Sequence, residues 1–202
     1  MCLLVLVLML FTVPSKAAAD NISIGVLSHR GDEATLKNWS PTADYLTRVV
    51  PDHEFRVVPL DFSEIEPAVK NAEVDFLLVN PGIYVAMEVR HRISRIATLN
   101  NLMEDRPYNV FAGVVFTLSE RSGINRLEDL IGKRLMAVDA TSLGGFQMGW
   151  RQLHDAGIDP YKDLAELTFG GTHDAVVEAV IQGKVDAGTF RTGILADMAA
   201  SG

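Results

Sequence analysis

The sequence contains a single cysteine, Cys2, which lies in an apolar N-terminal run. The rest of the chain therefore has neither a disulfide bond nor a thiol nucleophile. It also lacks the HExxH and CxxC patterns of metal sites and the GxxxxGK[ST] and GxGxxG loops of nucleotide-binding proteins. No GxSxG elbow is present either. We expect no catalytic residue, no metal and no cofactor in these residues.

Clustered basic residues are missing as well. The 202 residues include 18 Lys and Arg against 26 Asp and Glu, which gives a formal net charge of -8 at pH 7. Nucleic acids and anionic membrane surfaces reward clustered positive charge, so neither is an expected partner. Hydrophobic residues make up 48% of the chain and charged residues 22%, which is typical of a globular protein with a buried core.

The N-terminus has the pattern of an export signal. The apolar run from Cys2 to Val13 is followed by Lys16 and by Ala17-Ala18-Ala19, which offers a small-residue cleavage site. The run is too short to cross a bilayer comfortably. No basic residue precedes it, so residues 1–19 are predicted to be either a signal peptide or an N-terminal anchor. Both alternatives predict a periplasmic or extracytoplasmic protein.

Strand-like and helix-like segments alternate after residue 20, which predicts an α/β fold with a mostly parallel sheet. Residues 20–109 form a predicted first lobe, with strands at 21–27, 55–60 and 75–79 and helices at 35–50, 63–71 and 81–89. Ser63 is a candidate cap of its helix. Two extended stretches, 93–99 and 110–118, flank a polar loop at 100–109. Residues 110–202 form a predicted second lobe, with helices at 127–131, 146–156 and 173–182 and strands at 134–139, 164–169 and 185–190.

Small polar residues and glycines follow three strands of the second lobe. Ligands of such sheets bind beyond the carboxyl ends of the strands, and helix N-termini there attract anions. The candidate residues are Thr141, Ser142, Thr172, His173 and Arg191. The hydroxyl residues could equally be plain helix caps, and His173 could cap its own helix. Arg191 supplies a fixed cation at the same edge.

The first lobe offers candidates at the corresponding edge of its own sheet. His29 and Arg30 follow the first predicted strand, and Asn80 precedes a helix that begins with Pro81. A solvated loop and a helix cap are the alternative interpretations of these residues.

Four segments resemble the phosphate- and phosphonate-binding (PhnD-like) periplasmic proteins of ABC transporters. They are DFLLVNPGIY at 75–84, VDATS at 138–142, GGTHDA at 170–175 and GKVDAG at 183–188. Four others, HRG at 29–31, WSPTADYL at 39–46, SRIATL at 94–99 and GTFRTGIL at 188–195, are more similar to the N-terminal sensor regions of histidine kinases, including the tetrathionate sensor type. The resemblance extends over nearly all of residues 20–202.

The resemblance implies a bilobed fold of the type II periplasmic-binding-protein class, with a ligand cleft between two α/β lobes. It implies oxyanion binding by Thr141-Ser142 and His173, with Tyr84 as an aromatic residue at the cleft. Arg191 fits the sensor pattern rather than the transporter pattern, which favours a sulfur oxyanion over phosphate or phosphonate. The expected function is an extracytoplasmic solute-binding domain, most simply the sensor region of a two-component histidine kinase.

Two other functions remain open. A transporter component would bind phosphonate or phosphate and deliver it to a permease, and an exported hydrolase would use Ser142 with a nearby histidine or acid. In the resembled family the chain returns to the first lobe, whereas this sequence stops within a predicted helix. We therefore expect a fragment of a longer chain, which in a sensor would continue into a membrane span and a kinase core.

Overall fold

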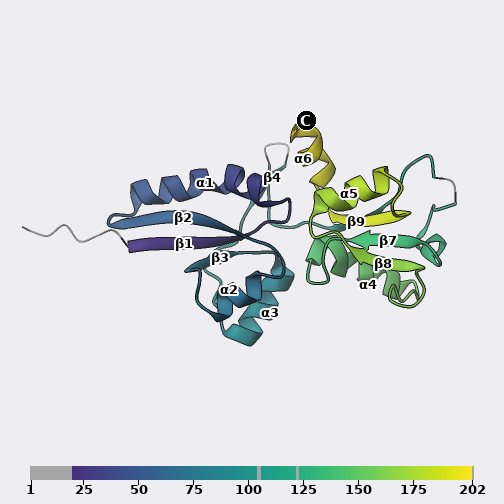
Figure 1. Ribbon diagram of the computed structural model, residues 1–202, viewed down its shortest axis with the longest axis horizontal. Helices are drawn as coiled ribbons and strands as arrows, with labels where there is room; N and C mark the ends of the chain where they lie inside the picture. The colour runs from purple at the N-terminus through teal and green to yellow at the C-terminus, as the bar shows by residue number, and fades with distance from the viewer. Residues whose placement is uncertain (1–19, 104–105, 122, 202) are drawn as a thin grey trace, which may run out of the picture.

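The computed structural model describes residues 20–103, 106–121 and 123–201. The predicted signal or anchor segment lies outside these ranges. Within them no helix combines the length and apolar character that a membrane crossing requires. The described chain forms two α/β lobes side by side, joined by an extended crossing (Figure 1).

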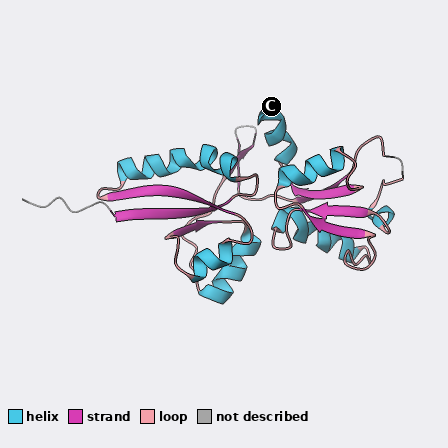
Figure 2. Ribbon diagram, viewed as in Figure 1, coloured by secondary structure: helices cyan, strands magenta, loops and turns pink. Residues whose placement is uncertain are grey.

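Lobe 1 contains a three-stranded parallel sheet with the order β2-β1-β3. Its strands are β1 (Asp20–Leu27), β2 (His53–Leu60) and β3 (Phe76–Leu78). Helix α1 (Asp32–Val49) covers one face, and α2 (Ile65–Lys70) and α3 (Pro81–His91) cover the other (Figure 2). The core of this lobe joins the strand ends to α2 and α3 through Leu27, Leu60, Ile65, Ile83 and Met87. The alternating strands and helices predicted for this half of the chain are confirmed.

The prediction that Ser63 caps its helix is wrong, because Asp61 accepts the backbone hydrogen bonds ahead of α2 instead. The Oδ1 atom of Asp61 accepts hydrogen bonds from the backbone N–H groups of Ser63 and Glu64, at 2.7 and 3.0 Å. The Ser63 hydroxyl donates a hydrogen bond to the same oxygen. Helix α2 therefore begins only at Ile65.

The crossing between the lobes also differs from the prediction. Residues 93–99 form no strand, whereas an antiparallel hairpin, β4 (Asn101–Met103) and β5 (Arg106–Tyr108), lies within the predicted polar loop. The apolar side chains that suggested an extended core segment are not buried, since Ile96 is 79% exposed.

Lobe 2 contains a four-stranded sheet with the order β6-β9-β7-β8. Its strands are β6 (Gly113–Phe116), β7 (Arg134–Ala137), β8 (Glu166–Phe169) and β9 (Ala187–Arg191). The last three are parallel and β6 runs antiparallel to β9. The helical segments are η1 (Leu127–Leu130), η2 (Leu143–Gln147), α4 (Met148–Asp155), α5 (His173–Ile181) and α6 (Ile194–Ser201).

The glycines of the 144–145 turn belong to a helix rather than to a loop. The π-helical turn η2 begins at Leu143 and runs directly into α4, three residues earlier than predicted. A Cβ atom on Gly145 would lie 2.5 Å from Val138, and one on Gly144 would lie 2.7 Å from the Cβ atom of Arg191. The missing side chains therefore let η2 pack directly on the ends of β7 and β9.

Candidate functional site

The three polar turns of lobe 2 lie at one edge of its sheet, as predicted. They follow β7, β8 and β9, which are parallel, so their carboxyl ends meet at the same edge. The loop after β1 of lobe 1 meets this edge, because His29 and Arg30 contact the start of α5. The candidate site is therefore a contact between the two lobes.

Three interactions join the lobes at this point. The backbone N–H of His173 donates to the backbone carbonyl oxygen of His29 at 3.0 Å. The two imidazole rings meet edge to face, with centroids 5.6 Å apart and an interplanar angle of 79°. The guanidinium of Arg30 donates to both carboxylate oxygens of Asp174, Nε to Oδ1 at 2.9 Å and Nη2 to Oδ2 at 2.8 Å.

Arg191 completes a group that we call the interlobe polar cluster: His29, Arg30, His173, Asp174 and Arg191. Arg191 ends β9, and its side chain is 25% exposed. Burial lowers the pKa of its guanidinium, while the negative charge of Asp197, whose Oδ2 lies 3.7 Å from Nη2, partly offsets this. The positive charge of Arg191 acts on the pKa values of both histidines, which places all three groups in one electrostatic environment.

Both histidines of the cluster are neutral at pH 7. Burial first, then the positive charge that His29 acquires when it is protonated, and then the charges of Arg191 and Arg30, lower the pKa of His173 to about 3. Burial first, and then Arg191, lower the pKa of His29 to about 4. Only 3% of His173 is exposed, so its charged form has lost almost all of its hydration.

Two polar atoms of the cluster are buried without a partner. Within the described part of the chain, neither Nδ1 of His173 nor Nε of Arg191 has a hydrogen-bond partner. Leaving such a group unpaired costs about 1–3 kcal/mol, and more for a charged group. The cluster therefore holds a buried cationic donor that an acceptor-rich ligand would satisfy.

Three of the predicted site residues are helix caps, which was the structural alternative to ligand binding. The side-chain oxygens of Asn80, Ser142 and Thr172 accept the backbone N–H groups of Ile83, Gly145 and Ala175, at 3.0, 3.1 and 3.2 Å respectively. Each cap orients a helix whose N-terminus lies at the carboxyl end of a strand. Among the described residues no histidine or carboxylate hydrogen-bonds to the Ser142 hydroxyl, so the hydrolase hypothesis has no base in this structure.

Two predicted residues are engaged elsewhere. The backbone N–H and hydroxyl of Thr141 both donate to Oδ1 of Asp139, at 2.7 and 2.6 Å, so the hydroxyl proton is already committed. Tyr84 donates its hydroxyl to Glu88 on its own helix, and this hydrogen bond raises its pKa. The structure does not bring Tyr84 into the interlobe polar cluster.

The contacts between residues of lobe 1 and residues of lobe 2 were not predicted from the sequence. Asp174 resembled an ordinary first-turn acid of α5 and gave no sign that it would bind Arg30. The close approach of lobe 2 at Gly82 was not expected either: a Cβ atom there would lie 2.8 Å from Oε1 of Gln147 and 3.4 Å from the carbonyl oxygen of Thr141. The only signal for Gly82 was a glycine in the first turn of a helix, where no turn requires one.

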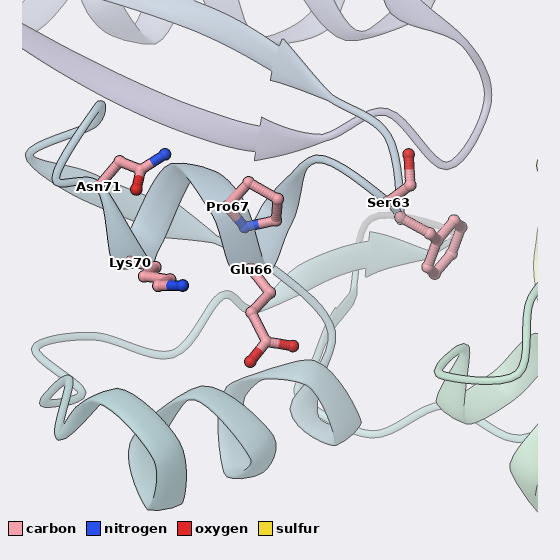
Figure 3. A pocket seen from close by; sticks show the side chains of 6 residues that line it. Ser63, Glu66, Pro67, Lys70 and Asn71 are labelled. Atoms are coloured by element: carbon pink, nitrogen blue, oxygen red, sulfur yellow. The ribbon is translucent and has the colours of Figure 1, made fainter.

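A surface hollow of about 550 Å³ lies along α2 in lobe 1, away from this contact (Figure 3). Ser63, Glu66, Pro67, Lys70 and Asn71 line it together with Phe62, and none of them was a predicted site residue. Glu66 accepts hydrogen bonds from Arg90 and from the ring of His91, so it holds α2 to α3. We assign no ligand to this hollow.

Known proteins share both the sequence pattern and the fold. The family described as the periplasmic substrate-binding protein of phosphonate ABC transporters matches residues 24–202. The tetrathionate sensor histidine kinase TtrS of Salmonella typhimurium is 31% identical over 182 residues, which cover 90% of this chain but only 31% of that protein.

Solved structures of transporter binding proteins have the same fold. PhnD1 from Prochlorococcus marinus, in complex with methylphosphonate, has a TM-score of 0.76 and 19% identity, and the match covers 89% of this chain and 66% of that one. The binding protein component of a phosphonate ABC transporter from Pseudomonas aeruginosa has a TM-score of 0.72 and 17% identity over 86% of this chain and 58% of that one. The chain thus spans less than two thirds of each of these relatives.

These matches confirm the bilobed type II binding-protein fold and the predicted resemblance. The matching family is described as the substrate-binding component of a transporter. The chain belongs to the family of periplasmic substrate-binding proteins of phosphonate ABC transporters.

Proposed function

We propose that this chain binds a small oxyanion between its two lobes and acts as the sensor region of a two-component histidine kinase. One observation carries the proposal. Nε of Arg191 and Nδ1 of His173 are buried without a partner at the point where the two lobes meet. An anion with several acceptor oxygens would satisfy the cationic donor that the protein leaves unpaired.

Binding between lobes gives the ligand a way to signal. A ligand that contacts residues of both lobes binds the closed arrangement more tightly than any open one, and it shifts the population accordingly. The proposed contacts come from Arg191, His173, Ser142 and Thr172 in lobe 2 and from His29 in lobe 1. The helix N-termini that Ser142 and Thr172 cap would add their positive dipole ends.

The sensor assignment is supported by the relative identified by sequence. The tetrathionate sensor kinase is 31% identical to this chain, compared with 19% and 17% for the two transporter proteins. We therefore place a sulfur oxyanion first among the ligands, ahead of phosphate and phosphonate. In a sensor the signal would pass to a membrane span and a kinase core, and we propose a membrane-associated protein on this basis.

A transporter component is the second candidate. The family match and the methylphosphonate bound to PhnD1 favour it. In that case the chain would deliver phosphonate or phosphate to a permease. The two candidates differ in ligand, so ligand specificity distinguishes them.

Thermal unfolding against sulfate, thiosulfate, tetrathionate, phosphate and methylphosphonate tests the proposal. A ligand that binds only the folded protein adds about 2.7 kcal/mol of stability at a hundredfold excess over its Kd. We expect a raised midpoint with a sulfur oxyanion and its loss in Arg191→Gln. Arg56→Gln removes the same charge from an exposed position on β2 and should keep the response.

A response to methylphosphonate alone would favour the transporter function. No response to any of the five anions at any pH between 5.5 and 7.5 would refute oxyanion binding.

A further inference from the structure

The neutral histidines of the interlobe polar cluster are poorly suited to an anion. Nδ1 of His29 lies 3.3 Å from the carbonyl oxygen of Leu27. Because a carbonyl only accepts, this nitrogen carries the proton, and Nε2 of the neutral ring is left with a lone pair. A neutral His173 likewise has one nitrogen that donates and one that can only accept.

Sulfur oxyanions present only acceptor oxygens to the protein at neutral pH. A lone pair on imidazole repels such a ligand, whereas a protonated ring donates from both nitrogens and adds a positive charge. Between the two rings, which are 5.6 Å apart, one proton is enough to supply an additional donor.

We propose that the interlobe site binds its anion together with a proton, which the His29–His173 pair takes up. This inference rests on the proposed function, since it concerns the same site. The anion offsets the contribution of the neighbouring cations to the low pKa values of the pair, because it places a negative charge beside rings that otherwise face Arg191 and Arg30. Binding should therefore strengthen as the pH falls.

Charged residues on β9, α5, α6 and the loop after β1 surround the His29–His173 pair. Arg191 at the end of β9 and Arg30 in the loop after β1 oppose protonation, and Asp174 in the first turn of α5 favours it at His29. The negative charge of Asp197 on α6 acts on Arg191 and Arg30, and so it affects the pair indirectly. The carboxylate of Asp174 balances the positive charge of Arg30, to which it is hydrogen-bonded. The charge of Arg191 is therefore the main positive charge that an incoming anion would balance.

Titration calorimetry of the purified 202-residue chain with sodium tetrathionate and sodium sulfate tests the proposal. These anions keep one charge state between pH 5.5 and 7.5, whereas phosphate and methylphosphonate would themselves take up protons. Each titration is run in two buffers of different ionisation enthalpy, so that the difference in heat gives the number of protons bound. We expect close to one proton at pH 6. The Kd should weaken towards tenfold per pH unit between the pKa of the free pair and the pKa of the complex, and it should level off above the latter.

His173→Gln and His29→Gln keep an amide that can donate but cannot titrate. We expect the proton uptake to fall in at least one of them, with weaker binding that no longer depends on pH. His154→Gln is the matched control, because the His154 side chain is 78% exposed on α4 and should leave proton uptake unchanged.

Tetrathionate or sulfate binding without proton uptake in the unmodified protein would overturn the inference and leave the proposed function standing. Undiminished uptake in the double variant His29→Gln/His173→Gln would overturn it as well, because the proton would then go elsewhere. The absence of binding of tetrathionate and sulfate at every pH would overturn the inference. Only a failure of all five anions in the thermal assay would refute the proposed function itself.

Discussion

The ion pair between Arg30 and Asp174 should determine how firmly the two lobes hold together. It is bidentate, and the side chains are 14% and 27% exposed. Exposed pairs contribute about 0–1 kcal/mol, and the loss of one partner from a fully buried pair costs about 3–5 kcal/mol. The intermediate burial predicts a coupling energy of about 1.5 kcal/mol, which is about a tenfold change in the ratio of closed to open protein.

A double-mutant cycle with Arg30→Gln and Asp174→Asn measures this coupling. The assay is the distance between fluorescent labels on Val49→Cys and Ile181→Cys, which are 50% and 62% exposed and lie on α1 and α5. Cys2→Ser removes the native thiol. Each single variant should lower the transfer efficiency, and the double variant should lower it little further.

The matched control is the pair formed by Arg151 and Asp155, which lies entirely within α4. Its distances are similar, 2.9 and 2.8 Å, but its side chains are 69% and 47% exposed. The coupling energy of this control pair should be about 0.3–0.5 kcal/mol, and its variants should leave the transfer efficiency between the two labels unchanged. An Arg30–Asp174 coupling no larger than this control, with unchanged transfer efficiency, would refute the claim that the bridge favours closure.

Three further predictions concern stability and closure. The free energy of unfolding should fall as the pH drops from 6.5 towards 3, because the histidine at position 173 binds a proton in the unfolded chain but not when it is buried in the folded one. Urea titrations of His173→Gln should show a free energy of unfolding that depends less steeply on pH. The same pH dependence in the variant and the unmodified protein would contradict the burial argument. Gly82→Val should hold the lobes apart, because its methyl groups would extend beyond a Cβ atom that already lies 3.4 Å from the backbone carbonyl oxygen of Thr141 and 2.8 Å from Oε1 of Gln147. An unaltered label distance would count against this packing. Asp186→Asn should lose about 1–2 kcal/mol in urea unfolding. This carboxylate accepts hydrogen bonds from the backbone and guanidinium of Arg134, whose side chain is 41% exposed, and a loss below about 0.5 kcal/mol would show that the ion pair is only a surface contact.

The fold was largely predictable because its signals are local. Strands β1, β7 and β9 are short apolar runs bounded by turns, and parallel strands need helices between them, so alternation alone predicted the α/β class. The hairpin β4–β5 was not predictable in this way. Its strands are three residues long, and their apolar side chains Leu102 and Tyr108 are 73% and 39% exposed, so no burial of these two side chains marks the pairing.

The candidate site was predictable only in part. Arg191 stood out because a cation directly after an apolar strand lies at a sheet edge, and the structure places it there. The pairing of Arg30 with Asp174 joins residues 144 positions apart and depends on how two lobes meet. No local pattern encodes that contact. The hydroxyl turns predicted a strand-to-helix edge correctly, but capping and ligand binding use the same residue types, so sequence could not separate the two roles.

The hydrogen bond from the His173 amide to the His29 carbonyl joins main-chain atoms alone. A substitution can therefore change the side chains around the interlobe site while the groups that make this bond stay in place. A binding protein with such a contact keeps one geometry of lobe docking as its recognition residues change. Relatives with different ligands could share this docking geometry, so a new specificity would not require a new way of closing.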